Sequence, residues 1–238
     1  MSLPVAILAG GLATRMRPLT SRQPKILIDV AGRPFAVRQL ELLQRRGVSH
    51  VVYCLGYLGE QVADALGDGS HFQMRFDYVF DGPQLLGTGG ALKEALPRLG
   101  PAFFVMYGDS YLECDFTDVE RAFQDSGKPG LMTVFRNDNR WGRSNVTYQH
   151  GRIVRYDKSD AAGGMQYIDY GLGVLTPGAF APWNAGRGPF DLSAVYQTLI
   201  ERDGLAGYEV YERFYEIGSI DGLAETRARI EARSRSVQ

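Results

Sequence analysis

Short apolar runs of strand length alternate with segments of helical period along the first half of the chain. The run Val5–Ala9 is continuously apolar and ends at Gly10, as expected for a parallel strand buried on both faces. Residues 35–46 place their apolar side chains largely on one helical face, and Gly47 ends that pattern. The same alternation predicts strands at 51–55, 74–80, 102–107 and 131–135 and helices at 59–66, 88–96 and 118–124. This order is typical of an α/β fold with a doubly wound, mainly parallel sheet.

The pattern changes after about residue 136. Short apolar segments at 146–148 and 153–156 flank the dipeptide His150-Gly151, which predicts a hairpin. The rest of the pattern predicts a strand at 168–175, a loop-rich passage at 177–189 and helices at 192–202 and 220–232. With no repeat or clear linker, we expect a single domain over residues 1–238 whose second half is mixed.

Composition excludes several classes of protein. Of the 238 residues 45% are hydrophobic and 22% charged, with a net charge of −1, so no basic surplus favours nucleic acid or membrane as a partner. Cys54 and Cys114 lack metal-ligand spacing. No run approaches the ~18 apolar residues of a membrane span, and we see no secretory signal, so we expect a cytoplasmic protein. The arginines of the last helix, at 227, 229, 233 and 235, are expected to be solvated.

The segment from residue 8 to residue 25 concentrates the candidate chemistry. Gly10 and Gly11 let backbone N–H groups approach a phosphate closely. Arg15 and Arg17 add charged donors suited to phosphate oxygens, and Lys25 can neutralise a triphosphate. The segment is neither a dinucleotide-binding fingerprint nor a P-loop, because no third glycine opens a helix and no Gly-Lys-Ser/Thr follows.

This segment resembles the signature of the sugar-1-phosphate nucleotidylyltransferases (sugar nucleotide pyrophosphorylases). That signature runs Gly-Gly-x-Gly-Thr-Arg, Arg-Pro-Leu-Thr, Pro-Lys and then Gly-x-Pro, and here Ala13 stands where the pattern has glycine. We expect Ala13 to adopt a negative φ that accommodates its methyl group. The resemblance implies a Rossmann-like, nucleotide-diphospho-sugar transferase-like fold, with nucleotide bound by about residues 1–135 and sugar phosphate by about residues 136–238.

Further motifs extend the resemblance over nearly the whole chain. The segment Leu86–Leu92 is similar to the family's second nucleotide loop, and Tyr107-Gly-Asp109 to its metal-binding strand end. Tyr215-Glu-Ile-Gly218 resembles the late Asp-x-Gly motif, with glutamate in place of the second aspartate. The resemblance implies that Asp109 and Glu216 hold Mg²⁺. It implies nucleotide binding by Leu8, Ala9, Gly10, Gly11, Asp81, Gly87, Thr88, Gly89 and Asp109.

The acceptor side follows from motifs of the second half. Arg140-Trp-Gly142 resembles the family's aromatic-glycine step, Tyr156-Asp-Lys158 its Glu-Lys pair, and Asp169-Tyr-Gly171 a sugar-facing strand. The resemblance implies sugar binding by Trp141, Gly142, Asn145, Asp157, Lys158 and Asp169. Asp157 and Asp169 could equally be fold-stabilising acids, and Trp141 a core aromatic.

The implied reaction is an in-line displacement on a nucleoside triphosphate by a sugar 1-phosphate, with Arg15, Lys25 and Lys158 as catalytic residues. The compact length and the loop Leu86–Gly90 look most like those of the short bacterial heptose- or mannose-1-phosphate guanylyltransferases. UTP or dTTP with glucose or N-acetylmuramate 1-phosphate, a phosphocholine-like acceptor, and a non-catalytic nucleotide-sugar sensor stay open. A glycosyltransferase is disfavoured because Asp109 is not part of an Asp-x-Asp motif. We expect a monomer or a homodimer.

Overall fold

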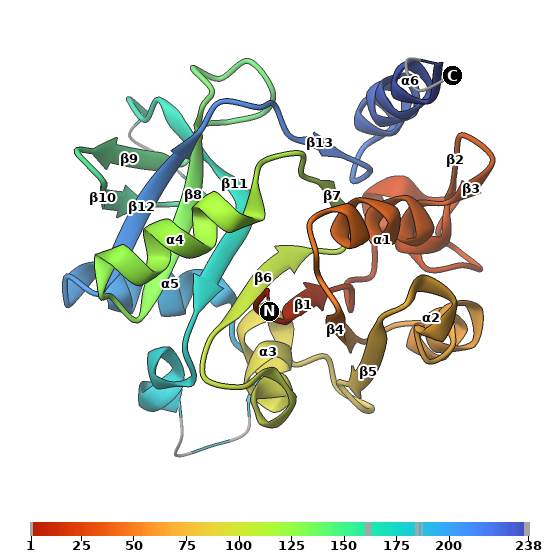
Figure 1. Ribbon diagram of the computed structural model, residues 1–238, viewed down its shortest axis with the longest axis horizontal. Helices are drawn as coiled ribbons and strands as arrows, with labels where there is room; N and C mark the ends of the chain where they lie inside the picture. The colour runs from red at the N-terminus through yellow and green to blue at the C-terminus, as the bar shows by residue number, and fades with distance from the viewer. Residues whose placement is uncertain (1, 160–162, 184–185, 187, 236–238) are drawn as a thin grey trace.

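Nine strands form one central sheet in the computed structural model, which describes residues 2–159, 163–183, 186 and 188–235 (Figure 1). They lie in the order β5-β4-β1-β6-β11-β8-β12-β10-β9. Their bounds are Val5–Leu8 (β1), His50–Leu55 (β4), Arg75–Phe80 (β5), Phe103–Tyr107 (β6), Gly130–Arg136 (β8), Val146–Gln149 (β9), Arg152–Tyr156 (β10), Tyr167–Leu175 (β11) and Leu205–Val210 (β12). Strand β9 also pairs with β11, so the strands from β11 to β9 curl back on themselves.

The strands of the first half are parallel, as the sequence predicted. Strand β1 pairs in parallel with β4 on one side and β6 on the other, and β4 pairs in parallel with β5. All four residues of β1 are buried, which explains why this strand is a continuous apolar run without alternation. The carboxyl ends of these strands therefore meet at one edge of the sheet.

Helices cover both faces of the sheet, which confirms the predicted doubly wound α/β fold. One face packs against α1, α2 and α4, and the other against α3 and α5 (Figure 1). The helices are Phe35–Arg45 (α1), Gly59–Leu66 (α2), Gly87–Leu99 (α3), Phe116–Ser126 (α4), Leu192–Glu201 (α5) and Ile220–Arg235 (α6). Among the described residues, no helix combines the length and apolarity that a bilayer crossing requires. The division into nucleotide-binding and sugar-binding halves stays a prediction.

The second half mixes strand directions. Strand β11 runs antiparallel to both β6 and β8, whereas β12 runs parallel to β8. Strand β12 is not among the predicted strands, because Gly207 interrupts its short apolar pattern. That glycine is needed for packing, since a Cβ on it would lie 2.7 Å from the Tyr148 ring.

Smaller elements complete the chain. Two short strand pairs join β2 (Asp29–Val30) to β3 (Arg33–Pro34) and β7 (Ser110–Tyr111) to β13 (Tyr215–Glu216). Four 3₁₀ helices span Thr14–Met16 (η1), Lys25–Leu27 (η2), Ser70–Phe72 (η3) and Pro177–Trp183 (η4). Helix η4 occupies much of the passage predicted as loop.

The arginines of α6 remain largely exposed, as expected, but two of them also form ion pairs that the sequence did not predict. The buried carboxylate of Glu113 accepts hydrogen bonds from Arg229, at 2.7 Å, and from Arg233. A buried carboxylate needs such partners, because burial without them would strongly disfavour its charge. These ion pairs attach α6 to the segment that follows β7.

We expect the Phe104→Ala variant to lose about 3–5 kcal/mol of unfolding free energy, the usual range for removing a buried phenylalanine ring. Phe104 is fully buried in β6, and its ring centroid lies 5.0 Å from that of Phe116. Tyr211→Ala is the matched control, because Tyr211 is 81% exposed and should change stability by less than about 0.5 kcal/mol. Urea unfolding of both variants measures the difference, and equal losses would contradict the assigned core.

Candidate active site

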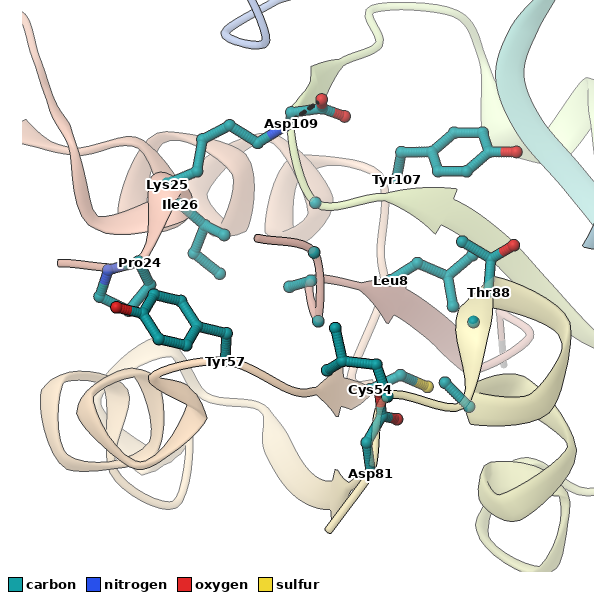
Figure 2. Close-up of a pocket in the computed structure, with 17 residues that line it drawn as sticks. Leu8, Pro24, Lys25, Ile26, Cys54, Tyr57, Asp81, Thr88, Tyr107 and Asp109 are labelled. Carbon is teal, nitrogen blue, oxygen red and sulfur yellow. Dashed lines mark hydrogen bonds and ion pairs between the residues drawn. The ribbon is translucent and has the colours of Figure 1, made fainter. Parts of the chain in front are cut away.

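A pocket of about 250 Å³ opens at the carboxyl ends of β1, β4 and β6 (Figure 2). All but one of the residues predicted to bind nucleotide line this pocket, and the exception is Gly89. Those that line it are Leu8, Ala9, Gly10, Gly11, Asp81, Gly87, Thr88 and Asp109. Figure 2 shows Asp81 and the Lys25–Asp109 pair at opposite ends of the pocket. This agrees with the sheet order, since Asp81 follows the edge strand β5 and Asp109 follows β6.

Glycines let the loops after neighbouring strands approach closely. A Cβ on Gly56 would lie 2.5 Å from the carbonyl oxygen of Gly10, and one on Gly108 would lie 2.9 Å from the Ala9 Cβ. The loops after β1, β4 and β6 are therefore packed backbone to backbone. Around Gly11, by contrast, a Cβ would meet no atom within 4 Å, so this stretch of backbone is open to a ligand.

Ala13 adopts a left-handed conformation with φ of 48°, so the expected negative φ is wrong. It immediately precedes helix η1, and its carbonyl accepts hydrogen bonds from Met16 N at 3.0 Å and Thr20 Oγ1 at 2.8 Å. These bonds hold a conformation that costs an L-residue roughly 1–2 kcal/mol. The same geometry explains why the family signature has glycine at this position.

Gly89 does not face the pocket. Its N–H donates to the carbonyl of Phe190 at 2.9 Å, and a Cβ on it would collide with the Phe190 ring. It lacks a side chain because the segment before α5 packs directly on the start of α3.

Three side chains that the sequence predicted to be functional converge around Gly218. A Cβ on this residue would lie 2.6 Å from Glu216 Oε2, 3.0 Å from Asp109 Oδ2 and 3.8 Å from an Arg15 guanidinium nitrogen. Lys25 joins the group, because its Nζ lies 2.5 Å from Asp109 Oδ2. Two carboxylates and two cations predicted from separate motifs therefore meet beside the pocket.

Backbone pairing places Glu216 beside the Asp109 turn. In the β7–β13 ladder Glu216 lies opposite Ser110, and Ile217 N donates to Asp109 O at 2.9 Å. The buried Gln39 side chain stabilises the Asp109 turn by donating hydrogen bonds to Ser110 O, at 2.8 Å, and to Tyr107 O, at 3.3 Å.

The loop before α6 orients the Glu216 side chain. Its carboxylate accepts hydrogen bonds from Gly218 N and, at 2.6 Å, from Ser219 Oγ, while Thr226 Oγ1 donates to its main-chain oxygen at 2.8 Å. A Cβ on Gly222 would overlap a carboxylate oxygen. Each carboxylate oxygen can accept more than one hydrogen bond, so the group retains capacity for a ligand.

A second group of polar side chains lies beside the pocket near Tyr107. Asp169 accepts from Gly171 N at 3.0 Å and from the Tyr156 hydroxyl at 3.1 Å. Lys158 Nζ lies 2.8 Å from Asp191 Oδ1 and 6.0 Å from the centre of the Tyr107 ring. Burial raises the pKa of Asp169, an effect that these hydrogen bonds and the nearby Lys158 only partly oppose.

The other predicted sugar-binding residues do not all join this group. Trp141 packs against Phe135 and beneath the Arg213 guanidinium, on the sheet face that includes Tyr170. Since side chains alternate along β11, Asp169 faces the opposite side from Tyr170. Gly142 lies on the same face of the sheet as Trp141, because a Cβ on it would lie 3.9 Å from the Ile168 side chain.

Asn145 and Asp157 organise the backbone around Asp169. Asn145 Oδ1 accepts from Asp169 N at 2.8 Å, and Asn145 O accepts from Asp157 N at 3.0 Å. The Asp157 carboxylate accepts from Ser159 N, at 2.9 Å, and from Arg155, at 3.0 Å.

The residues assigned to the nucleotide by number do not make up the whole lining of the pocket. The pocket is also lined by Pro24, Ile26, Cys54, Tyr57, Leu85, Ala91, Tyr107 and Gly108. Tyr57 and Leu85 are exposed apolar side chains, a feature that only the structure reveals. The sequence indicates only one role for Asp191, because an acidic residue directly before an apolar helical segment predicts an N-cap. It caps α5 through Ser193 N, at 2.8 Å, but its contact with Lys158 depends on the fold.

Burial shapes the chemistry at the Asp81 end of the pocket. It raises the pKa of Asp81, although Leu86 N donates to this carboxylate at 3.2 Å. Burial, together with the nearby Asp81 charge, raises the pKa of the Cys54 thiol to about 12. Cys54 is therefore an inert thiol at neutral pH.

The chain is similar in sequence and in fold to several known proteins. Residues 5–155 match the family model described as nucleotidyl transferase. An N-acetylmuramate alpha-1-phosphate uridylyltransferase from Neisseria meningitidis is 43% identical over 228 residues, covering 93% of this chain and 96% of the relative. A glucose-1-phosphate thymidylyltransferase from Streptomyces antibioticus is 28% identical over 92% of this chain, which spans 64% of that relative.

A crystal structure of HddC from Yersinia pseudotuberculosis complexed with GMP-PN has the same fold. The TM-score is 0.77 at 22% identity, and the alignment covers 96% of this chain and 99% of HddC.

The chain belongs to the nucleotidyl transferase family. It is an enzyme of the transferase class, and the family predicted from its motifs is confirmed.

The raised pKa of Asp169 predicts how stability depends on pH. When the folded-state pKa of a carboxyl exceeds its unfolded value, about 3.9, stability is lost as pH rises through that folded pKa. The Asp169→Asn variant lacks this loss. Its unfolding free energy relative to wild type should therefore be higher at pH 7 than at pH 3.

Asp203→Asn is the control of opposite sign. Hydrogen bonding from Lys128 and the charge of Arg152 lower the pKa of Asp203, so this variant should lose stability relative to wild type as pH rises from 3 to 7. Urea unfolding at both pH values measures the two variants. The same pH trend in both would contradict the environment assigned to Asp169.

Proposed function

We propose that this enzyme transfers the uridylyl group of UTP to N-acetylmuramate 1-phosphate and releases pyrophosphate. The Neisseria meningitidis relative named for that activity is 43% identical over nearly the full length of both chains. The guanylyltransferase specificity expected from chain length has weaker support, since a mannose-1-phosphate guanyltransferase from Xenopus laevis is 29% identical over 72% of this chain. The names of these relatives all include a sugar 1-phosphate as the acceptor.

The observation that carries the reaction class is the convergence of Arg15, Lys25, Asp109 and Glu216 at one end of the pocket. Cations there would stabilise negative charge on the triphosphate as it is cleaved. A domain that only senses nucleotide sugars would not need two carboxylates facing the same phosphates. This arrangement favours a catalyst over the alternative of a silent sensor.

The nucleotide would lie along the pocket from Asp81 to Asp109. We assign the base to the end formed by Asp81, Leu85 and Tyr57, where the lining combines apolar side chains with one carboxyl group. The phosphates would follow Gly10 and Gly11, whose open backbone suits close approach.

The acceptor would lie between this pocket and β11. Lys158 carries the positive charge that a sugar phosphate requires, and Asp169 offers carboxylate oxygens to sugar hydroxyls. Trp141 and Gly142 are left out of this assignment because they lie on the other face of the sheet. Asn145 and Asp157 would act indirectly, through the backbone that holds Asp169.

The proposed reaction is a single displacement at phosphorus. An oxygen of the acceptor phosphate forms a bond to the α-phosphorus of UTP, and the bond from that phosphorus to the bridging oxygen breaks. Lys158 would hold the attacking phosphate, while Arg15 and Lys25 would neutralise the departing pyrophosphate. The reaction needs no nucleophilic side chain.

Asp109 and Glu216 form a donor set that suits Mg²⁺. This ion usually takes one or two carboxylates and completes its octahedron with water and phosphate oxygens. No group of three or more His, Cys, Asp or Glu side chains that could hold a metal occurs among the described residues. A metal held by only two carboxylates would therefore also bind oxygens of the triphosphate. There it would screen the negative charge of the phosphates. We propose Mg²⁺ on this basis.

A substrate panel tests the proposed function directly. Purified protein is assayed for pyrophosphate release with UTP, GTP, dTTP and CTP, each against the α-1-phosphates of N-acetylmuramate, glucose, mannose and a heptose. We expect the highest kcat/KM for UTP with N-acetylmuramate 1-phosphate. A preference for GTP with mannose or heptose phosphate would restore the specificity expected from chain length. No release with any pair would leave the sensor alternative.

The Asp109→Asn and Glu216→Gln variants test the carboxylate pair. We expect kcat/KM to fall on the order of 100-fold or more in each, as when one charge-stabilising group is removed from an active site. Both should also weaken the binding of Mn²⁺ in the presence of UTP, measured by electron paramagnetic resonance. Asp115→Asn is the matched control, because Asp115 is exposed and caps α4, a role that asparagine fills equally well. Unchanged Mn²⁺ binding in both variants would refute the metal assignment.

A further inference from the structure

The segment Phe190–Leu192, here called the strap, lies directly on the start of α3. The carbonyl of Phe190 accepts hydrogen bonds from Gly89 N at 2.9 Å and Gly90 N at 3.3 Å. The first N–H groups of a helix have no partner within the helix, so the strap satisfies two of them. The contact is close, because a Cβ on Gly87 would lie 2.6 Å from the Phe190 carbonyl oxygen.

Thr88 connects the strap to the nucleotide pocket. Its hydroxyl accepts a hydrogen bond from Leu192 N at 2.8 Å and lies 3.1 Å from Asp191 Oδ2, to which it donates. The same residue lines the pocket (Figure 2). A nucleotide that contacts the loop at Thr88 would therefore also restrain Asp191.

Asp191 connects the strap to the acceptor side. Its Oδ1 accepts from Lys158 Nζ at 2.8 Å and from Ser193 N at 2.8 Å. An ammonium group has three N–H donors, so Lys158 can bind Asp191 and a phosphate at the same time. Thr88, Asp191 and Lys158 thus form a continuous connection from the nucleotide loop to the group assigned to the acceptor phosphate.

Helix capping alone does not account for these contacts. Asp115 caps α4 by accepting from Thr117 N at 2.8 Å, and a cap requires no more than that. Asp191 makes the equivalent bond and also contacts Thr88 and Lys158. The Lys158 and Asp191 side chains are 44% and 50% exposed, and ion pairs with such exposure add little to stability. The effect of this pair should therefore appear in substrate binding.

We propose that Asp191 is a positioning residue that couples the two substrate subsites, so that each substrate binds more tightly when the other is present. This inference rests on the proposed function. Nucleotide bound at the Thr88 loop would immobilise the strap, and Asp191 would then hold Lys158 in the orientation that receives the acceptor phosphate. The first substrate to bind would order the Lys158 side chain, so the second would lose less conformational entropy on binding. This produces positive coupling between the two substrates.

Two substitutions separate the roles of Asp191. Asp191→Ser keeps a good N-cap but has no carboxylate to reach Lys158. Asp191→Asn keeps the cap and the side-chain length but removes the charge. Asp203→Asn is the matched control, because Asp203 also pairs with a lysine, Lys128 at 2.9 Å, but follows the opposite end of α5 from Asp191.

The measurement is the KM for the acceptor at saturating and at subsaturating nucleotide, together with kcat and melting temperature. In wild type we expect the acceptor KM to fall about 5-fold or more on nucleotide saturation, within the usual range of coupling between sites. In Asp191→Ser this ratio should approach one and the acceptor KM should rise about tenfold. The kcat should change less than the acceptor KM does. The change in melting temperature should be no larger than the change seen in Asp203→Asn. Asp191→Asn should lie between the two.

A wild-type ratio near one, or an unchanged ratio in Asp191→Ser, would overturn this inference while leaving the proposed function intact. Equal loss of kcat and melting temperature without a change in the ratio would assign Asp191 a purely structural role and would also overturn it. Failure of the wild-type enzyme to release pyrophosphate is a different result, since it removes the proposed function and this inference together.

Discussion

The short β7–β13 ladder is the interaction on which the proposed reaction centre depends. It pairs Ser110–Tyr111 with Tyr215–Glu216, two segments far apart in the sequence, and so brings Glu216 to the turn that carries Asp109. Few backbone hydrogen bonds hold a two-residue ladder, and isolated pairs of this kind are marginal in water. Support comes from both sides: Gln39 binds the Asp109 turn, and Arg229 and Arg233 attach α6 to Glu113. The C-terminal helix therefore contributes to the site although only its leading loop approaches the pocket.

Charge balance explains why these side chains can lie together. Asp109 and Glu216 would repel both each other and a triphosphate if they stood alone, but Lys25 contacts Asp109 and Arg15 lies beside the same point in space. The cations offset the repulsion between the two carboxylates, while a bound triphosphate would offer Lys25 a second anionic partner. A site that mixes both signs of charge can thus bind an anion and its counter-cation together.

The two halves of the chain meet along β6 and β11, which run antiparallel in the middle of the sheet. Tyr107 at the end of β6 lies between the nucleotide pocket and the Lys158–Asp169 group, with its hydroxyl buried and without a hydrogen-bond partner among the described residues. In Figure 2 its ring points away from the Lys25–Asp109 pair. Tyr107 and the strap would therefore form a wall common to the two proposed subsites.

Local physical chemistry explains what the sequence determined. The buried runs of β1 and β6, the glycines after them and the helical faces depend on neighbouring residues, so the parallel sheet and about half of the residues that line the pocket could be predicted. Other features follow from contacts between distant segments. The Phe190 ring fills the space beside Gly89, and a hydrogen bond from Thr20 supports the left-handed conformation of Ala13. Trp141 lies on the opposite face of the sheet from Asp169. Strand β12, the pairing of the α6 arginines with Glu113 and the contact of Asp191 with Lys158 likewise appear only after the chain has folded. A sequence pattern specifies which side chains a segment carries, whereas tertiary packing decides which of them meet.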